Sequence, residues 1–159
     1  MHRDLFVYLD LGGVPELVGR LWSRLRKGRE SATFEYHQSW LNKPKSFLLQ
    51  PALTVGPGAF HTTANEPLFS GLGDSAPDRW GRILMRREEH RRAISAKEEP
   101  RTLREIDFLV LVDDEARQGA LRFAERDGGP FLTQYGPNKI PPLVALRRRW
   151  YHATQRSLM

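Results

Sequence analysis

The side chains best suited to chemistry in this sequence are its histidines and its acidic clusters. The five histidines, at positions 2, 37, 61, 90 and 152, do not fall in the HxxxH spacing of a zinc site. Asp113, Asp114 and Glu115 follow one another and could hold magnesium, but a solvated loop is the simpler interpretation of this cluster. We therefore expect no metal site.

Two segments imitate catalytic motifs without the surroundings that those motifs need. His2-Arg3-Asp4-Leu5 spells the start of a protein-kinase catalytic loop, but Leu9 stands where that loop needs a magnesium-binding Asn. Gly71-Leu72-Gly73 imitates a dinucleotide fingerprint, although no buried strand leads into it. The sequence also lacks cysteine, a GxxxxGK[ST] loop and a GxSxG elbow. We expect no catalytic residue and no cofactor.

Aromatic and arginine side chains near one predicted helix start are better candidates for function. Each of the four tryptophans, at positions 22, 40, 80 and 150, is expected in a core by default. Trp80 stands apart because it lies among charged residues, and aromatic and arginine anchors carry many protein interfaces. The candidate interface consists of Asp78, Arg79, Trp80 and Arg82.

The charge of the chain is clearly positive, with 25 basic and 19 acidic residues and a formal net charge of +6. Such an excess attracts nucleic acid or an acidic partner. Most of the basic residues have acidic neighbours, which is typical of a solvated, salt-bridged surface. The exception is a candidate basic patch made of Arg147, Arg148 and Arg149.

Two helices follow from capping signals. Ser75-Ala76-Pro77-Asp78 is a helix-start signature with Ser75 as the cap, and the pattern predicts a helix that reaches Ala96. Its second half, residues 86–97, is nearly all charged and should stand in solvent. Thr102-Leu103-Arg104-Glu105 has the spacing of a capping box and predicts the other helix.

The rest of the chain indicates a mostly antiparallel sheet. Alternating apolar residues and turn signals predict strands over 5–11, 14–22, 31–36, 46–50 and 119–125, one helical turn over 38–42 and a loop over 54–60. A last helix should begin at Leu143. The order favours an α+β fold, with a small antiparallel sheet or partial barrel, two main packed helices and a C-terminal helix. We expect a domain over residues 1–125, then a linker and helix over 126–159.

Composition narrows the class of protein. A chain of 159 residues with 40% hydrophobic residues can build one compact core. No apolar run has the length of a membrane span, and the first residues lack a signal-peptide pattern. With zero cysteines there is no disulfide framework, so we expect a cytoplasmic protein.

Six segments, taken in order, carry a family resemblance. They are Val7 to Asp10, Val18 to Leu21, Phe34 to Tyr36 followed by Trp40-Leu41, Phe47 to Pro51, Phe69 to Arg82 and Arg117 to Phe123. Together they resemble the N-terminal subdomain of HipA-type Ser/Thr kinases, the toxins of bacterial toxin–antitoxin systems. The most specific segment is Phe69 to Arg82, which contains Asp74-Ser75-Ala76-Pro77-Asp78.

The resemblance implies a partner rather than a reaction. In the family this subdomain sits on the kinase core and helps to contact a HipB-like DNA-binding antitoxin. In some tripartite systems a separate small protein of this kind acts as the antitoxin of a shortened kinase. The ATP-binding loop and the catalytic residues of the family would come after Met159, so no catalytic residue is carried over.

Three hypotheses follow. The first is a non-catalytic regulatory module that binds a HipA-type kinase core or an antitoxin, in cis or in trans. The second is an inactive remnant of a truncated HipA-like kinase gene. The third is a basic nucleic-acid-binding module that uses Arg147 to Arg149 and the helix from Arg79.

Overall fold

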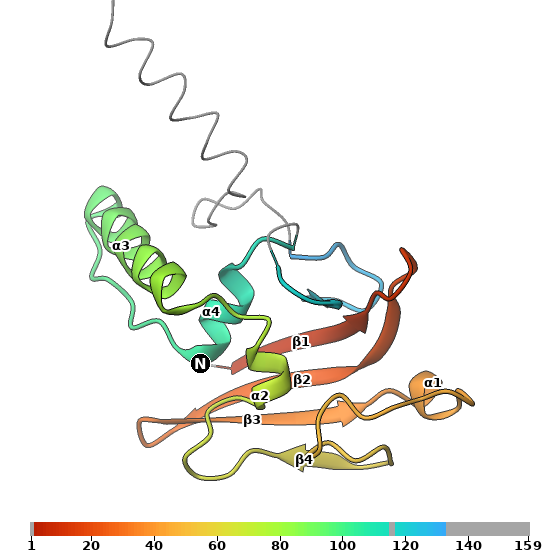
Figure 1. Cartoon of the computed structure of the whole chain (residues 1–159). Helices are drawn as coiled ribbons and strands as arrows, with labels where there is room; N and C mark the ends of the chain where they lie inside the picture. The colour runs from red at the N-terminus through yellow and green to blue at the C-terminus, as the bar shows by residue number, and fades with distance from the viewer. Residues whose placement is uncertain (1, 115–116, 133–159) are drawn as a thin grey trace, which may run out of the picture.

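A computed structural model describes residues 2–114 and 117–132. In this part of the chain an antiparallel sheet with the strand order β4-β3-β2-β1-β5 carries helices on one side (Figure 1). The predicted α+β class is confirmed, and the sheet does not close into a barrel. The elements are β1 (His2–Leu9), β2 (Glu16–Arg26), β3 (Arg29–Tyr36), α1 (Gln38–Leu41), β4 (Ala59–His61), α2 (Ser70–Gly73), α3 (Arg79–Ala96), α4 (Glu105–Leu111) and β5 (Leu121–Ala124).

Strands β1, β2 and β3 form the predicted meander, and its turns have the expected chemistry. Between β1 and β2, the Asp10 Oδ1 atom accepts hydrogen bonds from the backbone N–H groups of Gly12 and Gly13 at 3.3 and 2.6 Å. Between β2 and β3, Lys27 and Gly28 have φ angles of 49° and 77°. Two consecutive positive φ angles match the twist of a tight hairpin. Strand β2 consequently runs to Arg26, beyond the predicted end at residue 22.

The strand predicted over residues 46–50 is wrong, because side chains rather than a neighbouring strand bind this segment. The Trp40 indole N–H donates to the Phe47 carbonyl at 3.3 Å, and the Leu49 N–H donates to the Tyr36 hydroxyl at 3.1 Å. The edge of the sheet is instead β4, which begins inside the predicted loop and pairs with β3.

Helix α3 ends at Ala96 as predicted, with Lys97 in a left-handed conformation at φ 55°. The predicted caps are wrong at both main helices. Asp78, not Ser75, caps α3, and α4 begins at Glu105 after Arg104 rather than at a Thr102 cap. No helix in the described residues is long and apolar enough to cross a membrane.

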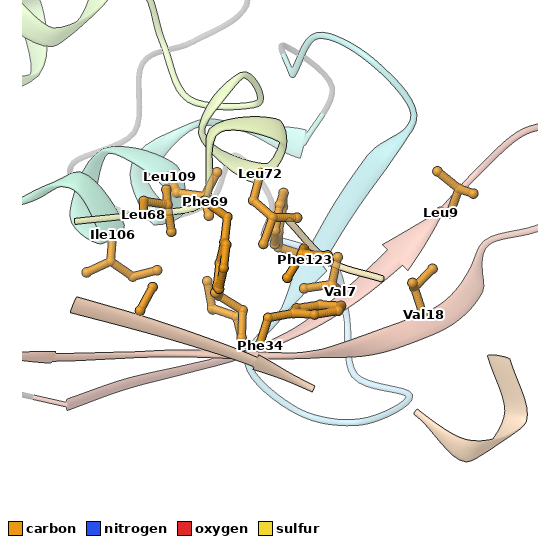
Figure 2. Close-up of a cluster of buried hydrophobic side chains, with 14 of the residues drawn as sticks. Val7, Leu9, Val18, Phe34, Leu68, Phe69, Leu72, Ile106, Leu109 and Phe123 are labelled. Atoms are coloured by element: carbon orange, nitrogen blue, oxygen red, sulfur yellow. The ribbon is translucent and has the colours of Figure 1, made fainter. Parts of the chain in front are cut away.

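The main core lies between the sheet and the two short helices α2 and α4 (Figure 2). The sheet contributes Phe34 and Phe123, while Phe69, Leu72 and Leu109 close the core from above. A smaller second cluster joins α3 to α4 and consists of Met85, Leu103, Phe108 and Val112. Helix α3 is thus attached to the rest of the fold through α4 and the residues that flank it. The predicted C-terminal helix lies outside the described residues, and the boundary at residue 125 stays a prediction.

Candidate interaction site

The candidate interface begins where the chain enters α3, and Asp78 fixes this entry. The Asp78 Oδ1 atom accepts a hydrogen bond from the Gly81 N–H at 2.8 Å, which satisfies one of the free donors of the first turn. A Cβ atom on Gly81 would lie 2.7 Å from the Pro77 Cβ atom, so glycine is needed for this close approach. Asp78 therefore has a structural task in the chain itself.

Arg82, another candidate interface residue, ties α3 to its neighbours. Its Nε donates to the Pro77 carbonyl at 3.0 Å, and its Nη1 lies 2.6 and 2.7 Å from the two carboxylate oxygens of Glu105. Its guanidinium group also lies 5.0 Å from the centre of the Phe108 ring. This arginine links the start of α3 to the start of α4, and only a small part of its side chain is exposed to a partner.

Trp80, unlike Arg82, is mostly exposed to solvent, with 62% of its surface accessible. The core position expected by default is therefore wrong for Trp80, although it is confirmed for Trp40, which is 2% exposed. Trp22 is half-buried on the sheet, and the fourth tryptophan lies outside the described residues. An exposed indole costs solvation free energy, and such rings commonly serve as contact anchors.

Further apolar side chains continue from Trp80 along the same side of α3. Ile83 and Ile94 are 38% and 66% exposed. At 100° per residue, positions 80, 83 and 94 fall within about 60° of one another around the helix. Met85 and Ala93 lie on the opposite, buried side, where Met85 packs in one cluster with Phe108 of α4. We call the side with Trp80, Ile83 and Ile94 the outer face of α3.

Positive charge accompanies the apolar side chains of this outer face. Arg79 and Arg87 are exposed, and neither forms an ion pair within residues 2–114 and 117–132. Arg91 is also exposed but pairs with Glu88 one helical turn earlier. Of the four candidate interface residues, Asp78, Arg79 and Trp80 are therefore exposed and Arg82 is partly buried. The side chains of Asp78 and Arg82 are engaged by contacts within the fold.

The far half of α3 is held by a residue that the sequence patterns did not reveal. Glu89 is 3% exposed and accepts hydrogen bonds from the guanidinium groups of Arg92 and Arg101, with the closest contacts at 2.8 Å. These bonds keep the pKa of the Glu89 carboxyl well below its usual range. Most of residues 86–97 are exposed, as predicted, but Glu89 and Ala93 are buried, and this clamp fastens the helix to the loop before α4.

The segments that imitated catalytic motifs have structural roles. Asp4, from the kinase-like tetrapeptide, lies in β1 and binds Arg20 across the sheet at 2.7 Å. In the glycine-rich segment, the Gly71 N–H donates to the Gln50 side chain at 2.6 Å, where a nucleotide phosphate would need it free. In the described residues no cluster of three or more His, Asp or Glu side chains could hold a metal ion.

The acidic cluster after α4 is buried rather than solvated, at the two positions that the structure describes. Asp113 is 1% exposed, and the side chain of Asp114 is 4% exposed and ion-paired with Arg122. Arg117 lies beside them and donates to the Ser75, Leu109 and Val112 carbonyls. Burial lowers the pKa of Arg117 to about 10. The solvated interpretation of this cluster is therefore wrong, and its charges hold the fold together.

The candidate basic patch of Arg147, Arg148 and Arg149 lies outside the described residues. A scan of the chain against models of known protein families gives no match, and a search of curated proteins gives none either.

Proposed function

We propose that this chain is a non-catalytic regulatory module that binds a HipA-type kinase core, in cis or in trans, through the outer face of α3. The partner comes from the resemblance, whose most specific segment, residues 69–82, ends in the first turn of this helix. The observation that carries the proposal is Trp80, a large aromatic side chain that is 62% exposed on a firmly anchored helix start.

Anchoring matters because a rigid contact residue loses little freedom when it binds. The Asp78 cap precedes Trp80, and the Arg82 ion pair with Glu105 follows it. The backbone that carries the indole is therefore fixed from both sides before a partner arrives. Exposed aromatic residues with this support have the properties of interface hot spots.

The outer face also indicates the kind of surface that it would fit. Trp80, Ile83 and Ile94 need an apolar groove, because they leave water on binding. Arg79 and Arg87, which accompany these side chains, favour acidic residues on the rim of that groove. We infer a partner with an apolar groove and an acidic edge.

The test is a pull-down of the full chain with a separately expressed HipA-type kinase core from the same genome, followed by calorimetry. We expect association at micromolar concentration. Trp80→Ala should weaken it by about 30-fold, the effect of losing a typical hot spot. The thermal midpoint Tm should hardly change, because the removed ring packs on little of its own chain.

Leu11→Ala is the matched control, since Leu11 is 71% exposed in the turn between β1 and β2, far along the chain from α3. It should bind like the unaltered protein. The proposal fails if the kinase core does not associate at all, or if Trp80→Ala and Leu11→Ala lose the same affinity. A HipB-like antitoxin tested in parallel distinguishes a kinase partner from an antitoxin partner.

A further inference from the structure

The side of the sheet opposite the core carries a row of arginine and tryptophan side chains along β2. Side chains alternate between the two faces of a strand, and Leu21 and Ser23 point into the core. The alternate residues 20, 22, 24 and 26 therefore share the other face. We call this set the Arg–Trp row, and it consists of Arg20, Trp22, Arg24 and Arg26. Figure 1 shows α2, α3 and α4 on the opposite side of the sheet.

Arg20 forms a flat platform within this row. Its Nε lies 2.7 Å from one carboxylate oxygen of Asp4, and an Nη contacts the other oxygen. The guanidinium group rests 5.7 Å from the centre of the Phe6 ring and 5.5 Å from that of Trp22. One side of this planar cation covers aromatic carbon, and its side chain remains 53% exposed. The platform is fixed in place by a charged, two-pronged contact.

The end of the row near the β2–β3 turn carries positive charges that have no counterion in the described structure. The exposed cations at this end of the β2–β3 hairpin are Arg24, Arg26, Lys27 and Arg29. None of them forms an ion pair with residues 2–114 or 117–132. Asp4 is engaged by Arg20, and Glu35, which pairs in register with Arg20 on β3, lies away from the hairpin end. The field at that end should draw in a polyanion.

We propose that the Arg–Trp row binds single-stranded nucleic acid. Positive grooves that alternate with aromatic surfaces suit such strands, because cations hold the phosphates while bases stack on aromatic rings or guanidinium planes. Residues on one face recur every ~6.7 Å along a strand. That is about twice the ~3.4 Å rise per nucleotide of a stacked duplex strand, so an extended strand matches the row better.

This site is separate from the surface in the proposed function. Helix α3 lies on the core side of the sheet, whereas the Arg–Trp row is on the other side (Figure 1). Neither proposal depends on the other, because binding of a kinase core and binding of nucleic acid are measured with different probes and different variants.

The test is fluorescence anisotropy of the full chain with a labelled mixed-sequence oligonucleotide, as single-stranded DNA, single-stranded RNA and duplex DNA. We expect both single strands to bind more tightly than the duplex at low salt. The logarithm of the association constant should fall linearly with the logarithm of the salt concentration, with a slope of about −0.7 for each phosphate contacted. Addition of the kinase core should leave this affinity unchanged.

Variants locate the contact. Trp22→Ala should weaken binding at least ~5-fold through lost stacking, while Trp22→Phe should keep most of it. The double variant Arg24→Ala/Arg26→Ala should both weaken binding and flatten the salt dependence. The charge-matched control is Arg79→Ala/Arg87→Ala on the core side of the sheet. Circular dichroism checks that each variant is folded.

Any of four results would overturn the proposal. The first is no binding of either single strand at low salt, and the second is tighter binding of the duplex. The third is an equal loss of affinity in Arg24→Ala/Arg26→Ala and in Arg79→Ala/Arg87→Ala, which would mean attraction by net charge alone. An Arg147→Ala/Arg148→Ala/Arg149→Ala variant that alone abolishes binding would move the site to the candidate basic patch and contradict the proposal equally.

Discussion

Glu89 illustrates how much of this fold depends on single charged residues. It lies in a helix half that is rich in charge, yet its carboxylate is buried and shared by two arginines. A buried carboxylate is stable only with such partners, because burial alone would favour its protonated form. The clamp it forms fixes the end of α3 to Arg101 in the loop that leads to α4.

Replacing this carboxylate should therefore destabilise the fold in a pH-dependent way. Glu89→Gln should lower the free energy of unfolding at neutral pH by about 1–3 kcal/mol, since charged hydrogen bonds are lost in a buried place. The Arg101 and Arg92 hydrogen bonds hold the pKa of Glu89 below its unfolded value of 4.5. The unfolded chain therefore binds this proton first as the pH falls, and the stabilisation is lost progressively below pH 4.5.

Urea unfolding of the unaltered protein and of Glu89→Gln, at neutral and acidic pH, measures this effect. The difference between their free energies of unfolding should be largest near neutral pH and should shrink below pH 4.5. A difference that stays constant with pH would contradict the clamp.

Gly19 is the second residue with a sharp prediction, because β2 and β3 meet closely there. A Cβ atom on Gly19 would lie 2.3 Å from the Glu35 carbonyl oxygen and 2.5 Å from the Phe34 ring. Neither the sheet backbone nor a fully buried ring can move away cheaply. Gly19→Ala should cost about 2 kcal/mol or more, measured by urea unfolding. Gly12→Ala, where a Cβ would meet nothing within 4 Å, should stay within about 0.5 kcal/mol.

At the scale of elements, the start of α4 is capped by a distant strand. The Glu30 carboxylate, from β3, accepts the Glu105 and Ile106 N–H groups at 3.0 and 3.2 Å and the Ser23 hydroxyl at 2.9 Å. The two backbone groups are donors that a helix leaves free in its first turn. The helix that closes the core is thus aligned by a residue far away in the sequence.

Glu30→Ala should loosen this helix. We expect a loss of about 1–2 kcal/mol, the range for removing a side-chain cap, and faster hydrogen exchange at Ile106 and the following amides. Glu35→Ala is the control, because Glu35 lies on the same strand but is exposed. If the α4 amides exchanged hydrogen at the same rate in Glu30→Ala and Glu35→Ala, Glu30 would not be the cap of α4.

Elements that depend on local residue patterns could be predicted from the sequence, whereas elements fixed by residues distant in the sequence could not. The meander, its two turns and the end of α3 follow from local alternation and turn residues, and the structure confirms them. The start of α4 at Glu105 could not be predicted, because its first N–H groups bind Glu30 from a distant strand and not the expected Thr102 cap. The failed strand at 46–50 has the right apolar residues, but β4 occupies the edge beside β3.

The candidate interface was also predicted only in part. The residue types around the start of α3 indicated an interface, and Trp80 is indeed exposed. The sequence alone could not tell Trp80 from the buried Trp40, since exposure depends on what packs above each ring. Asp78 and Arg82 were grouped with it by proximity, although contacts to Gly81 and Glu105 bind them into the fold.

At the scale of the whole molecule, α3 is the outermost layer of the described structure. The sheet packs on α2 and α4, and α4 in turn carries α3 through a small apolar cluster (Figure 1). A helix attached on one side only leaves its other side for a partner, and in α3 that side is the one with the exposed tryptophan. The fold therefore leaves this side of α3 exposed, while its core lies between the sheet, α2 and α4.

Hydrogen exchange of the full chain, alone and with a HipA-type kinase core, tests most directly whether α3 is the contact surface. We predict that the kinase core slows exchange along α3 (Arg79–Ala96), most strongly in the turns near Trp80 and Ile83. Protection confined to the sheet, or no protection at a concentration of kinase core that saturates binding, would contradict this prediction.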